Sequence, residues 1–211
     1  MKLIIDQVYS HTSDEHPFFK QSKNDKVNDK ADWYVWADPK EDGGPPNNWL
    51  SVFGGSSWQW HNERNQFYLH NFLTSQPDLN FHNEEVQQQM LDEIEYWLKL
   101  GVDGFRFDVI NFLFHDSGLR DNPAKDPKLV RPLGFNKDNP YGLQIHKYDN
   151  TQPETLEYLS RVRKVLDKYD AISVGEIVSE NPLDVIGEYA NDQRLHTVSY
   201  THLTLPTITG V

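Results

Sequence analysis

Two segments carry apolar residues at helical spacing. We expect amphipathic helices over residues 84–100 and 153–169, because apolar positions three and four residues apart share one helix face. The apolar positions are Val86, Met90, Ile94, Trp97 and Leu98 in the first, and Leu156, Leu159, Val162, Val165 and Leu166 in the second. Gly101 suits the end of the first helix, and Pro153 suits the start of the second. A shorter helix is predicted over residues 182–190.

Short apolar runs lie between these helices and predict strands. They cover residues 3–5, 102–109 and 171–175. Strands that alternate with helices indicate parallel βαβ units, and therefore an α/β fold. Residues 11–83 differ, being rich in Asp, Asn, Gly, Pro and Trp, and predict loops with short strands such as 33–36 and 66–69. A stretch of that length is too long for a linker, so we expect a small inserted subdomain.

Composition narrows the function classes. The chain has 211 residues and a net charge of -12, which argues against nucleic acid and anionic membranes as partners. It has no Cys, so disulfides and thiolate metal sites are excluded. We find neither a signal peptide nor an apolar run of membrane-spanning length, and expect a cytoplasmic protein unless a leader is missing with the true N-terminus. The oligomeric state is not predicted.

Three carboxylates lie at predicted strand ends. Asp6, Asp108 and Glu176 each stand at or just before the C-terminal end of a strand. In a βα barrel that edge carries the chemistry. A single carboxylate there would suit a helix cap equally well, but three with polar companions favour an active site.

Arg106 and Asp108 should point to the same side of their strand, because side chains alternate along it. A guanidinium beside Asp108 would keep this carboxylate ionised, as a glycosyl nucleophile requires. The alternative is a structural Arg–Asp pair. Glu176 would complete the two carboxyl groups that a retaining glycosidase holds about 5–5.5 Å apart. The negative charge of Asp108 would raise the pKa of Glu176, which suits an acid.

Asp6 and His11 flank the exit from the first strand. His11 would suit donation of a hydrogen bond to a sugar hydroxyl. The alternative, a structural Asp6–His11 contact that holds the insertion in place, stays open. Aromatic residues crowd the insertion, and we expect most to form its own core and one or two, such as Phe53, to contact sugar.

Four motifs in order resemble glycoside hydrolase family 13, the α-amylase family. The residues are Asp6-x-Val8-x-Ser10-His11, Gln76-Pro77-Asp78-Leu79-Asn80, Gly104-Phe105-Arg106-Phe107-Asp108 and Gly175-Glu176. The second resembles the signature of the oligo-1,6-glucosidase branch. The resemblance implies a partial TIM (β/α)8 barrel, strands three to five, formed by residues 1–10 and 84–196. Residues 11–83 would be the inserted small α+β subdomain, called domain B.

The resemblance also implies roles. Asp108 would be the nucleophile and Glu176 the acid/base, while Arg106, His11 and Asp6 would bind the glucose unit. Val109 resembles the residue of α-1,6-preferring enzymes. The implied protein is a retaining α-glucosidase that acts on short oligosaccharides. The alternative is a catalytically silent amylase-like domain for carbohydrate binding or scaffolding.

Several expected parts have no match. The family's fourth region and first two barrel strands are absent, so we expect a fragment of a longer enzyme. No cofactor is implied, although calcium is expected to be possible in the full-length parent. Residues 197–211 look like a non-family tail of artefactual origin, resembling translated adapter DNA.

Overall fold

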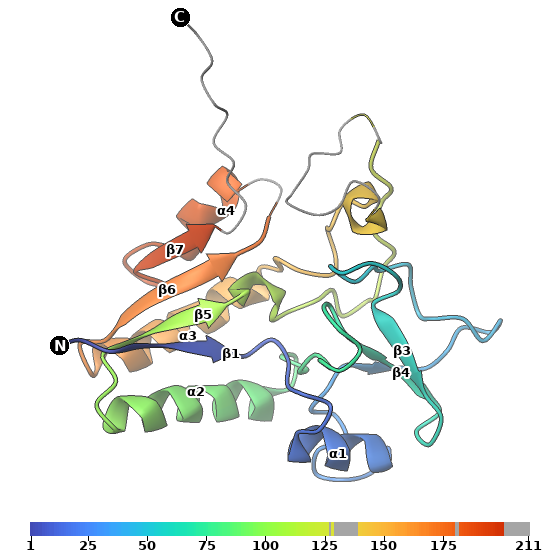
Figure 1. Ribbon diagram of the computed structural model, residues 1–211, viewed down its shortest axis with the longest axis horizontal. Helices are drawn as coiled ribbons and strands as arrows, with labels where there is room; N and C mark the ends of the chain where they lie inside the picture. Colours follow the sequence, from blue (N-terminus) through green and yellow to red (C-terminus); the bar gives the residue numbers. More distant parts are fainter. Residues whose placement is uncertain (127, 129–138, 180–181, 201–211) are drawn as a thin grey trace, which may run out of the picture.

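A four-stranded parallel sheet positions the strand-end carboxylates. The computed structural model describes residues 1–126, 128, 139–179 and 182–200. The strands lie in the order β1 (Ile4–Val8), β5 (Gly104–Asp108), β6 (Ile172–Ile177) and β7 (Thr197–Tyr200), as Figure 1 shows. They are parallel because a long connection carrying a helix joins each to the next, and this alternation confirms the expected α/β fold of a partial TIM barrel.

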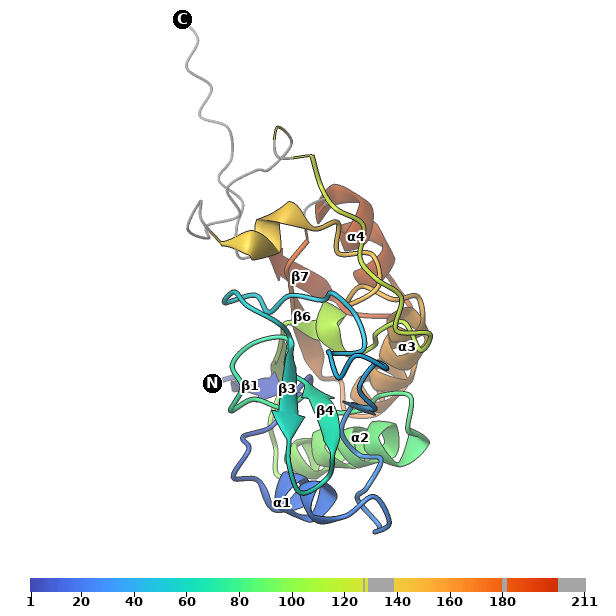
Figure 2. The same ribbon diagram turned by 90° about the vertical axis from the view of Figure 1, so that its right-hand side faces the viewer.

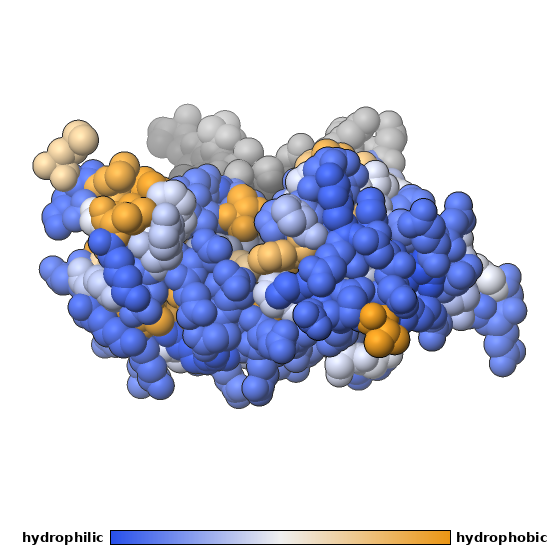
Figure 3. All heavy atoms as spheres, turned by 90° about the horizontal axis from the view of Figure 1, so that it is seen from below, coloured by the Kyte–Doolittle hydropathy of each residue, from blue (hydrophilic) through white to orange (hydrophobic). Residues whose placement is uncertain are grey.

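Helices cover one face of this sheet. They are α2 (Glu84–Lys99), α3 (Glu154–Asp167) and α4 (Pro182–Tyr189). The side chain of Asn83 accepts a hydrogen bond from Glu85 N–H and caps α2, and Gly101 adopts φ 97° after its end. The apolar faces of α2 and α3 join Phe105 and Phe107 of β5 in one hydrophobic core. The molecular surface seen from below, the side on which Figure 1 draws α1 and α2, is mostly hydrophilic (Figure 3).

Domain B lies beyond the C-terminal ends of β1 and β5 (Figures 1 and 2). It contains α1 (Pro17–Asn24) and an antiparallel sheet in the order β2 (Trp36–Ala37), β4 (Gln66–Leu69), β3 (Trp58–His61). Buried Arg64 donates hydrogen bonds to three backbone carbonyls around the end of α1, those of Ser22, Asp25 and Ala31. Two 3₁₀ turns, η1 (Ile110–Phe112) and η3 (Pro140–Leu143), follow β5.

The aromatic residues of domain B divide between two clusters: Trp49 and Trp58 lie in a core of domain B, whereas Trp33 joins the main core with residues of α2 and β5, which the prediction of a separate core did not include. Trp33, Trp49 and Trp58 are buried, and the rings of Trp49 and Trp58 stack with centroids 5.9 Å apart. The indole N–H of Trp58 donates to Asn47 Oδ1, which leaves this buried polar group satisfied.

Four segments differ from the sequence predictions. The strand expected at 33–36 shrinks to β2, because Tyr34 and Val35 pair with the backbone of residues 78–79 instead. Helix α1 and strand β3 were not predicted, although Pro17 stands at the first helical position, where proline is typical. Within the presumed tail, Thr197–Tyr200 forms β7 beside β6, whereas residues 201–211 lie outside the described residues.

Asp78 links domain B's stability to pH. Its side chain is buried and accepts hydrogen bonds from the backbone and side-chain amides of Asn71, yet burial raises its pKa from 3.8 to about 8. The folded state therefore keeps a proton that the unfolded state releases. As pH rises from about 4 to 8, the free energy of unfolding should fall, by at most about 5 kcal/mol.

Asp78→Asn should flatten this pH dependence, because the amide cannot ionise. Denaturant unfolding at pH 5 and pH 8 would measure it. Asp29→Asn, which removes the same charge from an exposed position, should keep the wild-type slope. Equal slopes in Asp78→Asn and wild type would contradict the assignment.

Candidate active site

Strand register brings four charged side chains to one face of the main sheet. Asp6 pairs with Arg106 across β1 and β5, and Asp108 follows Arg106 on the same side. On β6, Gly175 pairs with Phe107, so Glu176 reaches the level of Asp108. The three carboxylates that the sequence singled out therefore meet around one guanidinium.

Arg106 contacts all three carboxylates. Its Nη1 lies 2.8 and 2.9 Å from the two Asp6 oxygens and 2.6 Å from Asp108 Oδ1. Its Nη2 lies 2.6 Å from Glu176 Oε2. Because Asp6 makes its ion pair with Arg106, this pairing replaces the Asp6–His11 contact that the sequence left open.

The electrostatics correct one expectation. We expected Arg106 to hold the pKa of Asp108 low. Instead, burial and a hydrogen bond with Glu176 raise the pKa of Asp108 above its ordinary 3.8, and the opposing effect of Arg106 is smaller. The pKa of Arg106 is itself raised by its hydrogen bonds with Asp6 and Asp108. Asp108 therefore keeps its proton to a higher pH than an ordinary aspartate does.

Backbone geometry sets the approach of β6 to the turn after β5. A Cβ at Gly175 would lie 2.4 Å from Leu195 Cδ1 and 3.2 Å from Ile110 Cγ2. A larger residue at 175 would therefore require the Leu195 side chain to shift, whereas glycine leaves this buried leucine in place beside Glu176. The close approach keeps the Glu176 carboxylate next to the end of β5.

Val109 adopts an unusual backbone conformation directly after Asp108. Its φ of 37° lies in the left-handed region, which is a genuine outlier for a β-branched residue. This turn places Val109 N–H 3.4 Å from Glu176 Oε2. The Val109 side chain is buried in a cluster with Val52, Phe112 and Tyr141, so it contacts domain B and the turn rather than open space.

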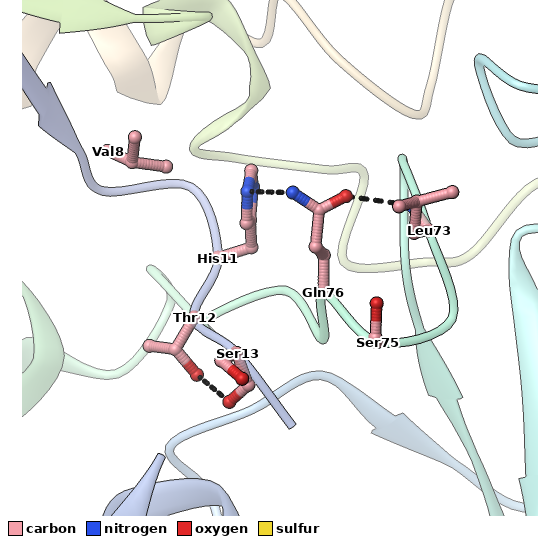
Figure 4. Close-up of a pocket in the computed structure, with 7 residues that line it drawn as sticks. All are labelled: Val8, His11, Thr12, Ser13, Leu73, Ser75 and Gln76. Atoms are coloured by element: carbon pink, nitrogen blue, oxygen red, sulfur yellow. Dashed lines mark hydrogen bonds between the residues drawn. The ribbon is translucent and has the colours of Figure 1, made fainter. Parts of the chain in front are cut away.

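His11 lies in the wall of an open pocket of about 430 Å³ (Figure 4). Its lining residues are Val8, His11, Thr12, Ser13, Leu73, Ser75 and Gln76. Nδ1 of His11 lies 2.8 Å from Ser10 Oγ, and Nε2 lies 2.9 Å from Gln76 Nε2. Burial lowers the pKa of His11 to about 4. Both ring nitrogens therefore have protein partners, and the donation of a hydrogen bond from His11 to a sugar hydroxyl stays a prediction.

Phe53 belongs to an aromatic row that ends at His11. Its side chain is 61% exposed, and its ring centroid lies 6.1 Å from that of Phe72. Phe72 in turn lies 5.2 Å from His11 and 5.3 Å from Phe112. Phe53 is thus accessible from solvent, and its contact with sugar stays a prediction.

Gln76 is the contact that sequence reasoning missed. It was noted only as part of the Gln76–Asn80 motif, with no role. The structure pairs residues 10–12 with 77–79 in an antiparallel arrangement, through the His11–Asp78 bridge and the hydrogen bond from Leu79 N–H to Ser10 O. Two separate motifs thus meet, and no pattern within either one predicts this.

Within the described part of the chain, no three His, Asp or Glu side chains are arranged to hold a metal ion. Across the same residues, none of the helices combines the length and the apolar character needed to traverse a bilayer.

Comparisons with known proteins agree with this geometry. The family model of the alpha amylase catalytic domain matches residues 1–207. A probable alpha-glucosidase of Rhizobium meliloti (strain 1021) is 55% identical over 193 residues, covering 90% of this chain and 35% of the relative. An oligo-1,6-glucosidase of Heyndrickxia coagulans is 37% identical over 194 residues, covering 92% of this chain and 33% of the relative.

Among solved structures, the alpha-glucosyl transfer enzyme XgtA superposes with a TM-score of 0.92 at 59% identity, covering 94% of this chain and 37% of that one. The chain thus spans about a third of the length of the proteins it matches.

Proposed function

The chain belongs to the α-amylase catalytic-domain family, and on that premise we propose that it carries the nucleophile and the acid/base of a retaining α-glucosidase. The proposed substrates are short oligosaccharides with a terminal α-linked glucose. One observation carries the proposal: Asp108 and Glu176 stand at neighbouring strand ends, hydrogen-bonded to each other and to one guanidinium. Names of the relatives, alpha-glucosidase and oligo-1,6-glucosidase, support the substrate class.

The geometry suits a two-step displacement. In the first step, ionised Asp108 forms a bond to the anomeric carbon while the glycosidic C–O bond breaks and Glu176 gives its proton to the leaving oxygen. In the second, Glu176 takes a proton from water, whose oxygen displaces Asp108. Burial and the hydrogen bond with Glu176 raise the pKa of Asp108, and the first step requires that this proton resides on Glu176 when the substrate reacts.

Arg106 would serve both steps. Its contacts with Asp108 and Glu176 hold the two carboxyl groups at a fixed spacing, and its positive charge favours the ionised nucleophile. Asp6 accepts two hydrogen bonds from Arg106 Nη1, which orients the guanidinium. We therefore assign Asp6 to positioning Arg106 rather than to direct contact with sugar.

Transfer to a sugar acceptor is a second candidate outcome of the same glucosyl-enzyme. The 59% identity to XgtA, an alpha-glucosyl transfer enzyme, favours it. A sugar hydroxyl would then replace water in the second step, with the same proton transfer to Glu176.

A nitrophenyl α-glucoside tests the proposal. We expect nitrophenol release by the chain, or by a chimera in which this chain replaces the segment it matches in the Rhizobium meliloti relative. Nitrophenol in excess of free glucose, when an acceptor sugar is added, would indicate transfer. Turnover of isomaltose faster than maltose would support the α-1,6 preference predicted from Val109. A folded chimera without turnover, beside an active parent, would contradict the proposed function and favour the silent relative.

A further inference from the structure

Hydrogen-bond complementarity fixes the protonation of the His11 ring. The starting point is the backbone N–H of Leu73, which can only donate, and it lies 3.1 Å from Gln76 Oε1. The Gln76 oxygen must therefore face Leu73, and the amide nitrogen faces His11 (Figure 4). A reversed amide would set two donors against each other at Leu73.

The amide nitrogen of Gln76 is also a donor without a lone pair to offer. His11 Nε2, 2.9 Å away, must therefore accept. A neutral imidazole with an unprotonated Nε2 carries its hydrogen on Nδ1, and Nδ1 lies 2.8 Å from Ser10 Oγ, which accepts it. Leu73 N–H thus determines the state of His11 through two hydrogen bonds.

We propose that Gln76 is a positioning residue that holds His11 as the neutral Nδ1–H tautomer, with the Nε2 lone pair committed to the Gln76 amide. The ring is fixed on three sides, by Ser10, Gln76 and Phe72, none of which is charged. The role of His11 and Gln76 in binding sugar rests on the proposed function, but the assignment of the His11 tautomer does not. If sugar binds here, the remaining N–H of Gln76, rather than a His11 N–H, is the donor that lines the pocket.

Nitrogen-15 NMR of the histidine rings reads the tautomer without any need for turnover. In the Nδ1–H form, the unprotonated nitrogen is Nε2, which couples to both carbon-bound ring protons, whereas Nδ1 couples strongly to only one. His11→Asn identifies the His11 signals among the nine histidines. We expect the Nδ1–H pattern in the wild-type chain, persisting to about pH 5 because burial lowers the pKa to about 4.

The substitution Gln76→Glu should reverse the direction of the hydrogen bond between residue 76 and His11. A carboxylate can only accept, so His11 should place a hydrogen on Nε2 and become easier to protonate, with its pKa raised by about 1–3 units. Gln59→Glu adds the same charge at an exposed position on β3 and should leave the His11 signals unchanged.

Three results would overturn the inference. They are an Nε2–H pattern or a mixture of tautomers in the wild type, an unchanged His11 in Gln76→Glu, and an equal shift in Gln59→Glu. An inactive chain with the predicted tautomer would count against the proposed function alone.

Discussion

Asp108→Ala is expected to lower kcat/KM for a nitrophenyl α-glucoside by at least about 10⁴-fold, in the chimera described above. The loss is large because no other described carboxylate occupies its place at the end of β5 beside both Arg106 and Glu176. The fold should persist, since Asp108 is only partly buried and its backbone pairing with Val8 does not involve the side chain. Nitrophenol release, with circular dichroism to check folding, measures both.

Adding azide to Asp108→Ala distinguishes the loss of the nucleophile from a general disruption of the active site. Azide can enter the space left by the Asp108 carboxylate and attack the face opposite the leaving group, which gives β-glucosyl azide. Asp92→Ala, which removes an exposed aspartate on α2, should keep wild-type kinetics. If Asp108→Ala retained more than about a tenth of the activity, the assignment of the nucleophile would be wrong.

Glu176→Ala should separate substrates by their leaving groups. A sugar leaving group needs a proton, so turnover of maltose and isomaltose should fall about 10²–10⁴-fold. Nitrophenolate leaves without protonation, so the first step with the aryl glucoside should be nearly unimpaired. The second step then becomes limiting, and rapid mixing should record a burst of nitrophenol followed by slow turnover.

Azide again tests the stereochemistry. In Glu176→Ala it should attack the glucosyl-enzyme without needing a base, which accelerates turnover and yields α-glucosyl azide, the opposite anomer from Asp108→Ala. Equal losses for aryl glucoside and disaccharide, without a burst, would argue that Glu176 has a structural role only.

The main sheet could be predicted because its signals are local. Apolar spacing located α2 and α3 to within two residues at each end, and the three predicted strands lie in the sheet. Strand alternation also placed Arg106 and Asp108 on one face correctly. Such features follow from the backbone geometry of one segment and need no knowledge of its neighbours.

The site's energetics depended on contacts that no single segment encodes. The direction of the Asp108 pKa shift was wrong because burial by distant residues outweighs a neighbour two positions away. The hydrogen bond between Gln76 and His11 joins residues that are 65 positions apart in the chain. In domain B, Arg64 binds three carbonyls contributed by α1 and the loop after it, and composition alone gave only an irregular stretch there.

Val109 has a further consequence. Its left-handed backbone costs on the order of 1–3 kcal/mol, which glycine at this position would largely recover. Glycine would also remove the side chain that ties the turn to Val52 and Tyr141, and with it the restraint on the N–H that faces Glu176. Selection for thermal stability and selection for catalytic turnover should therefore oppose each other at residue 109. A screen for thermostable variants should recover glycine at this position, and such variants should have a lower kcat.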